Sequence, residues 1–261
     1  MKAVMFDMDN TLLETQVLYE DAHVELAQLV NRFGTFPEKD VVETLRAFEV
    51  DLFTHFGYGK EMLPQAFENT LLKLVPNATD ALVDEARGLA YNVYAREAQL
   101  KAGAVEAVTE LSKHFRLFLV TAGDDDVQQG RIAKLAFAHL FEEIYIVPEK
   151  DRAVFEHVLA KAGLKPADAV MIGDSLRSDV HPALEAGMSA IHINAQNWAG
   201  REMAGLKLPE NGVASFTNVL DAAAKIMREA GVASAPALQP RNDNQAGAPQ
   251  SAPQKPQQRK P

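Results

Sequence analysis

The sequence predicts an α/β protein: a parallel sheet with helices on both faces, together with an all-helical region inserted near the N-terminus. Short runs that are apolar on both faces of a strand alternate with amphipathic helical patterns, as in sheets covered on both sides. Residues 14–100, between the first two runs, show helical periodicity and no strand-like run. Because this segment is too long for a crossover connection, we expect it to form a small domain of its own.

Five runs have the length of a strand and end in polar residues. They are KAVMFD (2–7), RLFLVT (116–121), EIYIV (143–147), AVMIGD (169–174) and SAIHIN (189–194). Helical patterns occupy the stretches between them, at 104–115, 126–140, 152–163 and 178–187. We therefore expect a Rossmann-like core built from residues 1–13 and 101–232.

Four helices are expected in the inserted segment. Its apolar residues recur at helical spacing in four stretches, 17–33, 41–56, 60–75 and 79–100. The connections near Leu13–Glu14 and Leu100–Lys101, where the segment leaves and rejoins the core, are expected to act as hinges. Residues 233–261 are rich in Pro, Gln and Ala without an apolar period, which predicts a disordered tail.

Composition restricts the classes of function. With 261 residues, 47% of them hydrophobic, the chain can bury the core of one large domain or of two modest ones. Its formal net charge of −10 argues against nucleic-acid binding through a general basic surface, and its apolar runs are too short to cross a membrane. The lack of cysteine excludes thiolate catalysis and Cys-ligated zinc. It also fits a reducing compartment, and since no signal peptide is recognised we expect a cytoplasmic protein.

Polar residues gather at the carboxyl ends of the predicted strands, the edge of an open parallel sheet at which ligands bind. In chain order they are Asp7 and Asp9, then Thr121, Ala122 and Gly123, then Lys150, then Asp174 and Asp179. Every strand end in this region carries a polar or charged group. We expect these groups to converge in one crevice.

Four carboxylates and one lysine in a single crevice require a cation, because like charges raise one another's pKa. An oxygen-only ligand set without His or Cys favours Mg²⁺ over zinc. Mg²⁺, a lysine, a hydroxyl and backbone N–H groups together form a receptor for a phosphoryl group. The residues thus predict Mg²⁺ as cofactor and a small phosphorylated metabolite as partner.

Four motifs in this order resemble the haloacid dehalogenase-like hydrolase superfamily, in particular its phosphatases with a type-one helical cap. They read DMDNT (7–11), LVTAGD (119–124), EKDRAVF (149–155) and IGDSLRSD (172–179), and each follows a predicted strand. The resemblance covers about residues 2–195, and the helical segment 14–100 falls where the family's cap falls. Asn10 stands where glycine is frequent, and Lys150 is one residue nearer to Phe155 than in the common form.

The resemblance implies a role for each residue of the first motif. Asp7 is the nucleophile that forms an aspartyl-phosphate. Asp9 is the general acid for the leaving alcohol and then the base for the attacking water, and Thr11 fixes the loop and orients Asp9. Asp7, Asp174 and the backbone carbonyl of Asp9 hold Mg²⁺.

The remaining motifs are implied to bind the phosphoryl group. Thr121 hydrogen-bonds phosphoryl oxygens, and the backbone at Ala122 and Gly123 belongs to the same substrate-binding loop. Lys150 neutralises charge on the nucleophile and the phosphate. Asp179 supports either the metal ligands or Lys150. Together these roles imply a phosphatase acting on a small phosphate monoester.

Alternatives to a phosphatase stay open at this point. A phosphomutase or phosphonatase of the same superfamily also carries a type-one cap. A phospho-aspartate signalling domain also uses Asp, Thr, Lys and Mg²⁺, but its phosphorylated aspartate lies in the middle of the domain and it has no cap. A catalytically silent binding protein would not need the Asp7 and Asp9 pair, and the superfamily's dehalogenases lack the second aspartate.

Two further groups of residues are candidates for function. The acidic stretch GDDD (123–126) is better explained as the N-terminus of the following helix than as a second metal site. In the inserted segment, five residues are candidates for facing a substrate, although each also fits a bundle core or a solvated face: Tyr19, His23, Phe53, Tyr58 and Lys60. The identity of the phosphate ester is not readable from these residues.

Overall fold

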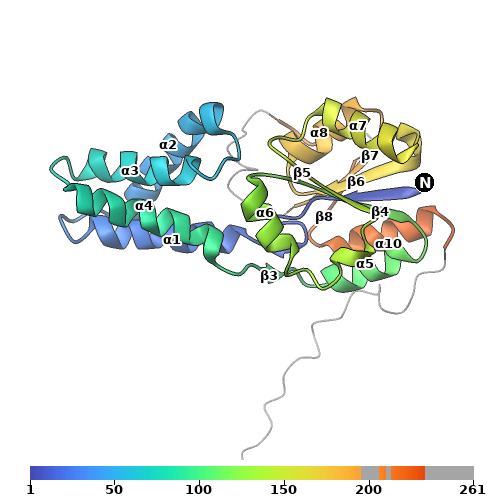
Figure 1. The fold of residues 1–261 in the computed structure, drawn as a ribbon, viewed down its shortest axis with the longest axis horizontal. Coiled ribbons are helices and arrows are strands. Elements are labelled where there is room, and N and C mark those ends of the chain that lie inside the picture. The colour runs from blue at the N-terminus through green and yellow to red at the C-terminus, as the bar shows by residue number, and fades with distance from the viewer. Residues whose placement is uncertain (195–205, 210–212, 233–261) are drawn as a thin grey trace, which may run out of the picture.

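The computed structural model describes residues 1–194, 206–209 and 213–232. Figure 1 shows a sheet layered between helices, with a bundle of helices beside it. The tail predicted to be disordered, 233–261, lies outside the described residues.

Six parallel strands form the sheet, in the order β5-β4-β1-β6-β7-β8. They are β1 (Ala3–Phe6), β4 (Arg116–Ala122), β5 (Glu143–Val147), β6 (Ala169–Gly173), β7 (Ser189–Ile193) and β8 (Ala214–Phe216). The first five are the predicted strands, so the predicted parallel sheet is confirmed. β8 was not predicted, because its three residues at a sheet edge are partly or fully exposed and form no apolar run.

Helices cover both faces of the sheet, as predicted (Figure 1). On β1, Val4 and Phe6 belong to the core beneath one face, with α5 (Ala104–Ser112) and α10 (Val219–Glu229). Ala3 and Met5 belong to the core of the other face, with α7 (Arg152–Ala162) and α8 (His181–Glu185). All four β1 residues are fully buried, which explains why this strand reads as a continuous apolar run.

Shorter elements connect the strands. The pattern predicted as one helix over 126–140 is α6 (Asp125–Ile132) followed by the 3₁₀ turn η1 (Ala138–Leu140). The pattern predicted at 178–187 is the π-helical turn η3 (Leu176–Val180), which runs into α8. A second 3₁₀ turn, η2 (Pro166–Asp168), precedes β6.

The inserted segment forms the four predicted helices between β1 and β4. They are α1 (Gln16–Val30), α2 (Glu38–Phe56), α3 (Met62–Leu74) and α4 (Asp80–Ala95). The bundle has its own core, in which Leu26, Leu45 and Phe67 are fully buried. The two connections to the sheet pair with each other as an antiparallel ribbon of β2 (Leu13–Glu14) and β3 (Gln99–Leu100), two strands that were not predicted. Across the described ranges, every helix is too short or too polar to cross a membrane.

Candidate active site

Three buried aspartates meet at the carboxyl end of the central strands. Asp7 follows β1 and is held in line by its N–H, which donates to the Ile172 carbonyl of β6 at 2.9 Å. Asp174 follows β6, and Asp179 lies in the π-helical turn η3 just beyond it. Carboxylate oxygens of these three residues lie within 4.8 Å of one another. β1 lies between β4 and β6, and from these two strands the chain continues toward opposite edges of the sheet. In open parallel sheets, ligands bind at this point, where the strand order changes direction.

Lys150 lies inside this cluster. Its Nζ is 2.6 Å from Asp7 Oδ1 and 2.5 Å from Asp179 Oδ1. Burial alone would lower the pKa of Lys150, but the carboxylates of Asp179 and Asp7 raise it above the ordinary value. The ammonium is therefore charged at neutral pH. Lys134 lies away from the cluster, on the surface, with its Nζ 3.9 Å from Glu97 Oε2.

A single lysine does not balance three buried carboxylates. Burial raises the pKa of the Asp7 carboxyl to about 7; Lys150 opposes this shift, and Asp179 and Asp9 reinforce it. Burial, with Asp7 and Asp179 next in effect, also raises the pKa of Asp174 well above its ordinary value. Asp7 Oδ2 is buried and has no hydrogen-bond partner within the described part of the chain. The site therefore has a buried acceptor and unbalanced negative charge, which fit a divalent cation.

Asp179 takes a supporting position in the cluster. Its Oδ2 accepts the Ser175 N–H at 2.9 Å, and its Oδ1 pairs with Lys150, so both of its oxygens are engaged. Gly173 makes room for this carboxylate: a Cβ added at Gly173 would stand 2.2 Å from Asp179 Cγ. Gly173 does not adopt a left-handed backbone conformation. A glycine is required there because the Asp179 carboxylate lies against its Cα.

Replacing Gly173 with alanine is therefore expected to lower both stability and activity. The added methyl group would push Asp179 away from Ser175 and Lys150, at a cost of about 1–3 kcal/mol for an overpacked site. Gly88→Ala on α4 is the matched control, because no atom lies within 4 Å of its added Cβ and alanine favours a helix. Thermal melts and turnover of both variants test this expectation, and a Gly173→Ala protein that matches wild type in both would contradict it.

Asp9 is held by two side chains of α6. Arg131 Nη1 donates to Asp9 Oδ1 at 2.8 Å, and Gln128 Nε2 donates to Asp9 Oδ2 at 2.9 Å. The loop turns sharply before Thr11, where Asn10 adopts a φ of 59°. This left-handed conformation explains a frequent glycine at this position, and asparagine is among the residues that tolerate it. Asn10 Oδ1 also accepts from the Gln16 N–H at 2.7 Å, at the start of α1.

Thr11 does not supply the orientation of Asp9 that was expected of it. Its hydroxyl is fully buried and has no hydrogen-bond partner in the described ranges. Arg131 and Gln128 hold the Asp9 carboxylate instead. The resemblance could not reveal this, because both residues lie about 120 positions away on another element.

The loop after β4 is organised by the same glutamine. Gln128 Nε2 also lies 2.9 Å from Thr121 Oγ1 and 2.7 Å from the Ala122 carbonyl oxygen. Gly123 has a φ of 143°, and a Cβ there would stand 3.2 Å from the same nitrogen. The structure thus brings Thr121, Ala122 and Gly123 next to Asp9, through an amide that sequence reasoning missed.

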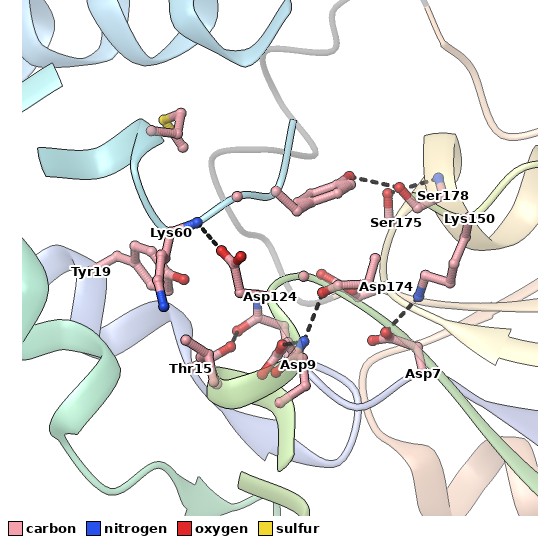
Figure 2. Close-up of a pocket in the computed structure, with 18 of the residues that line it drawn as sticks. Asp7, Asp9, Thr15, Tyr19, Lys60, Asp124, Lys150, Asp174, Ser175 and Ser178 are labelled. Carbon is pink, nitrogen blue, oxygen red and sulfur yellow. Dashed lines mark hydrogen bonds and ion pairs between the residues drawn. The ribbon is translucent and has the colours of Figure 1, made fainter. Parts of the chain in front are cut away.

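The helical bundle contacts the site through the loop between α2 and α3. Asp124 accepts the Lys60 backbone N–H, and Lys60 Nζ donates to Asp126 Oδ2 at 2.6 Å. The Tyr58 hydroxyl lies 2.6 Å from Ser178 Oγ of η3. Figure 2 shows Lys60 and Asp124 on one side of the site, and Ser178, Lys150 and Asp7 on the other. The bundle is therefore docked on the sheet domain at two points.

These contacts revise the interpretation of the acidic stretch 123–126. Asp125 and Asp126 lie in the first turn of α6, where acidic residues suit the helix dipole. Asp124 occupies the N-cap position, but its side chain makes no capping hydrogen bond. It receives the Lys60 N–H from the bundle instead, so Asp124 contacts the bundle and does not cap α6 with its side chain.

Bundle and sheet domain together enclose a cavity of about 360 Å³ above the aspartates. Asp7, Asp9, Gly123, Lys150, Asp174 and Asp179 line its sheet side. Of the five bundle candidates, Tyr19, Phe53, Tyr58 and Lys60 line it, and His23 does not. His23 is buried against Glu49, at 3.1 Å from Nε2 to Oε1. Glu49 does line the cavity and was missed, because one acidic residue on an amphipathic helix gives no distinguishing signal.

Comparison with known proteins gives a family match and several relatives. The chain matches the haloacid dehalogenase-like hydrolase family over residues 1–187. It is 26% identical over 199 residues to the N-acylneuraminate-9-phosphatase of Rattus norvegicus, which covers 72% of this chain and 80% of that protein. It is also 26% identical over 228 residues to the glyceraldehyde 3-phosphate phosphatase of Methanothermobacter thermautotrophicus, with 75% and 87% covered.

Solved structures share the fold. A haloacid dehalogenase-like hydrolase from Xanthomonas campestris matches with a TM-score of 0.74 and 24% identity, covering 88% of this chain and 94% of that one. A hydrolase from Bacillus subtilis, solved with magnesium bound, matches with a TM-score of 0.63 and 19% identity, covering 88% and 99%. At these identities the likeness concerns the arrangement of sheet and inserted helices.

Proposed function

The chain belongs to the haloacid dehalogenase-like hydrolase family, and we propose that it is a Mg²⁺-dependent phosphatase that hydrolyses a small phosphate monoester through an aspartyl-phosphate. The observation that carries this proposal is the pair of carboxylates at the end of β1. Asp7 has one oxygen on Lys150 and one buried oxygen without a partner in the described ranges, and Asp9 lies two residues away at the same cavity. The two curated relatives reported above are phosphatases.

The reaction proceeds in two steps on Asp7. An Asp7 oxygen attacks phosphorus, the bond from phosphorus to the leaving oxygen breaks, and Asp9 gives that oxygen a proton. Water then attacks phosphorus, Asp9 takes a proton from it, and the bond to Asp7 breaks to release inorganic phosphate. Asp9 is restored to its first protonation state, so the cycle closes.

Neighbouring groups stabilise the charge that moves in these steps. Lys150 remains charged beside Asp7, and the Thr121 hydroxyl and the Gly123 backbone provide polar groups to the phosphoryl oxygens. Arg131 and Gln128 keep the Asp9 carboxylate fixed at the cavity wall. Positioning of this kind accounts for most of the catalysis expected in phosphoryl transfer, because its transition state is loose.

Asp7, Asp174 and the backbone carbonyl of Asp9 would hold the Mg²⁺ ion, with Asp179 supporting Lys150. When bound, the ion neutralises charge on the phosphoryl oxygens and on the crowded carboxylates. The buried, oxygen-only character of the cluster supports this assignment. Magnesium is also present in the related fold from Bacillus subtilis.

The helices of residues 14–100 act in this proposal as a cap on the core, residues 1–13 and 101–232. The contacts of Lys60 and Tyr58 hold the cap closed over the aspartates and exclude bulk water. The β2–β3 ribbon is the hinge at which the cap opens. The substrates of the relatives, an acylneuraminate 9-phosphate and glyceraldehyde 3-phosphate, support a sugar-type phosphate as substrate.

Removal of the metal tests the proposal directly. Treatment with EDTA is expected to abolish release of inorganic phosphate from p-nitrophenyl phosphate, and Mg²⁺ is expected to restore it while Zn²⁺ is not. The reason is that the ligands are hard oxygen donors, with no His or Cys in the cluster. Full activity in metal-free buffer would contradict the site. The same assay distinguishes hydrolysis from a mutase reaction. A hydrolase releases inorganic phosphate and forms no phosphorylated acceptor, whereas a mutase transfers the phosphoryl group to an acceptor hydroxyl.

A further inference from the structure

The cap side of the cavity holds a buried carboxylate that the proposed reaction does not use. Glu49 of α2 is 1% exposed and lines the cavity. Its Oε1 accepts from His23 Nε2 at 3.1 Å. Its Oε2 is buried and has no hydrogen-bond partner within the described residues. A buried acceptor left in this way costs free energy, and at a cavity wall a ligand can satisfy it.

A buried donor accompanies this acceptor on the core side. Arg131 Nη1 donates to Asp9 Oδ1, whereas Arg131 Nη2 is buried and makes no hydrogen bond of normal geometry in the part of the chain that the structure describes; the Tyr19 hydroxyl lies beside the guanidinium. Tyr19 of α1 lies close to both residues: burial raises the pKa of its phenol, Arg131 opposes the shift and Glu49 adds to it. A polar strip thus runs from Asp9 through Arg131 and Tyr19 to Glu49.

Apart from Thr15, Gln16 and Lys60, the other cap residues that line the cavity are apolar or aromatic. Val50, Phe53 and Met62 line it, and the Phe53 ring packs at 5.0 Å, edge to face, on Tyr58. Lys60 is engaged with Asp126. Glu49 is the one acidic residue among the described cap residues at the cavity wall, and a group that lies against its unpaired oxygen must donate a hydrogen bond or carry positive charge.

The strip discriminates among leaving groups. A hydroxyl group both donates and accepts, so a polyol can satisfy Glu49 Oε2 and Arg131 Nη2 together. A carboxylate would suit Arg131 but would be repelled by Glu49, and a hydrocarbon would satisfy neither. The cavity, about 360 Å³, is at the small end of the range of about 300–1,000 Å³ for ligand sites.

We infer that Glu49 selects the substrate. The substrate is the phosphate ester of a small polyhydroxylated alcohol, of sugar or sugar-alcohol type, and one hydroxyl of this alcohol donates to Glu49 Oε2. A second anionic group at that end of the leaving group is rejected. This inference rests on the proposed phosphatase function. It adds the residue that recognises the leaving group and the kind of group, a hydroxyl rather than a second anion, that this residue accepts.

Substrate preference of the wild-type enzyme gives the first test and needs no variant. With Mg²⁺, kcat/KM is expected to be higher for a hexose 6-phosphate than for phosphoglycolate, whose leaving group carries a carboxylate. A preference for phosphoglycolate would overturn the inference. An amino-sugar phosphate shows whether Glu49 binds a hydroxyl or an ammonium group of the substrate. A preference for the amino-sugar phosphate over the hexose ester would indicate an ammonium and overturn the polyol assignment.

The Glu49→Gln variant gives the second test. It keeps the size of the side chain but places a neutral amide at the cavity wall. We expect kcat/KM for the hexose ester to fall about tenfold, as for loss of one hydrogen bond to a charged group. We expect kcat/KM for phosphoglycolate to rise. p-Nitrophenyl phosphate, which has no hydroxyl for Glu49, should change by less than about twofold on the same reasoning. Glu43→Gln, on the same helix with its side chain 61% exposed, is the matched control.

The outcomes separate the two proposals. If the wild-type enzyme hydrolyses p-nitrophenyl phosphate and Glu49→Gln changes all esters in parallel or none, the phosphatase function stands and the selection by Glu49 is wrong. If the wild-type enzyme hydrolyses no phosphate ester, both proposals fall. A melting temperature for each variant shows whether loss of the His23 contact has disturbed the cap. An unfolded Glu49→Gln protein returns the decision to the wild-type comparison.

Discussion

Replacement of Asp7 with asparagine is expected to lower phosphatase turnover by at least about a thousandfold, because the variant lacks the nucleophilic oxygen. The side chain keeps its shape, and Lys150 keeps its contact with Asp179. The fold should therefore survive. In metal-free buffer the melting temperature should equal or exceed that of wild type, because one of three buried carboxylates is gone and with it part of their repulsion.

The measurement is steady-state hydrolysis of p-nitrophenyl phosphate together with a thermal melt. Asp84→Asn, an exposed aspartate on α4, is the control for the chemistry of the substitution. Mass spectrometry of fresh protein guards against slow deamidation back to aspartate. If Asp7→Asn retains more than a few per cent of wild-type turnover, Asp7 is not the nucleophile and the aspartyl-phosphate mechanism is wrong.

Replacement of Asp9 with asparagine should produce a loss that depends on the leaving group. General acid catalysis contributes about 10²–10⁴-fold when the leaving oxygen needs a proton. Alkyl phosphate esters should therefore lose about 10²-fold or more, while p-nitrophenyl phosphate, whose phenolate leaves without an acid, should lose much less in the first step. The phosphorylated enzyme should accumulate, since its hydrolysis lacks the base.

Trapping of the intermediate by acid quench and mass spectrometry completes this test. Asp9→Asn could also disturb the contacts with Gln128 and Arg131, which donate to the Asp9 carboxylate. The asparagine amide nitrogen would present a donor to one of them in place of an acceptor, so a second variant tests this effect separately. A Gln128→Glu variant, which places a carboxylate beside Asp9, would displace Asp9 from the leaving oxygen and should lower turnover of alkyl esters more than that of p-nitrophenyl phosphate. Equal losses on alkyl and p-nitrophenyl esters in Asp9→Asn, with no trapped intermediate, would remove Asp9 from the acid and base roles.

Strands and helices were predictable because their signals are local. A strand buried on both faces, such as β1, is an unbroken apolar run, and each bundle helix shows its apolar residues at helical spacing. The positions of Asp7, Asp174 and Lys150 could also be anticipated. Parallel strands deliver the residues after them to one edge of the sheet, so the order of the motifs along the chain already implies a shared crevice.

Weak local signals account for what was missed in the fold. β8 and the β2–β3 ribbon have two or three residues each and are stabilised by pairing with distant segments. The helix predicted over 126–140 ends at Ile132, where the chain turns toward η1. In each case contacts outside the local sequence decide the conformation.

The sequence by itself determined the α/β fold, the inserted helices and the residues at the strand ends, because these depend on period and order along the chain. Only the tertiary structure decided what surrounds them. It brings Gln128 and Arg131 into hydrogen-bonding contact with Asp9. It also brings Asp124 to the backbone N–H of Lys60 and places Glu49 in the cavity wall. These contacts join residues that are tens to more than a hundred positions apart on different elements. Their partners follow from how the cap packs against the sheet, and no period within one element encodes that packing.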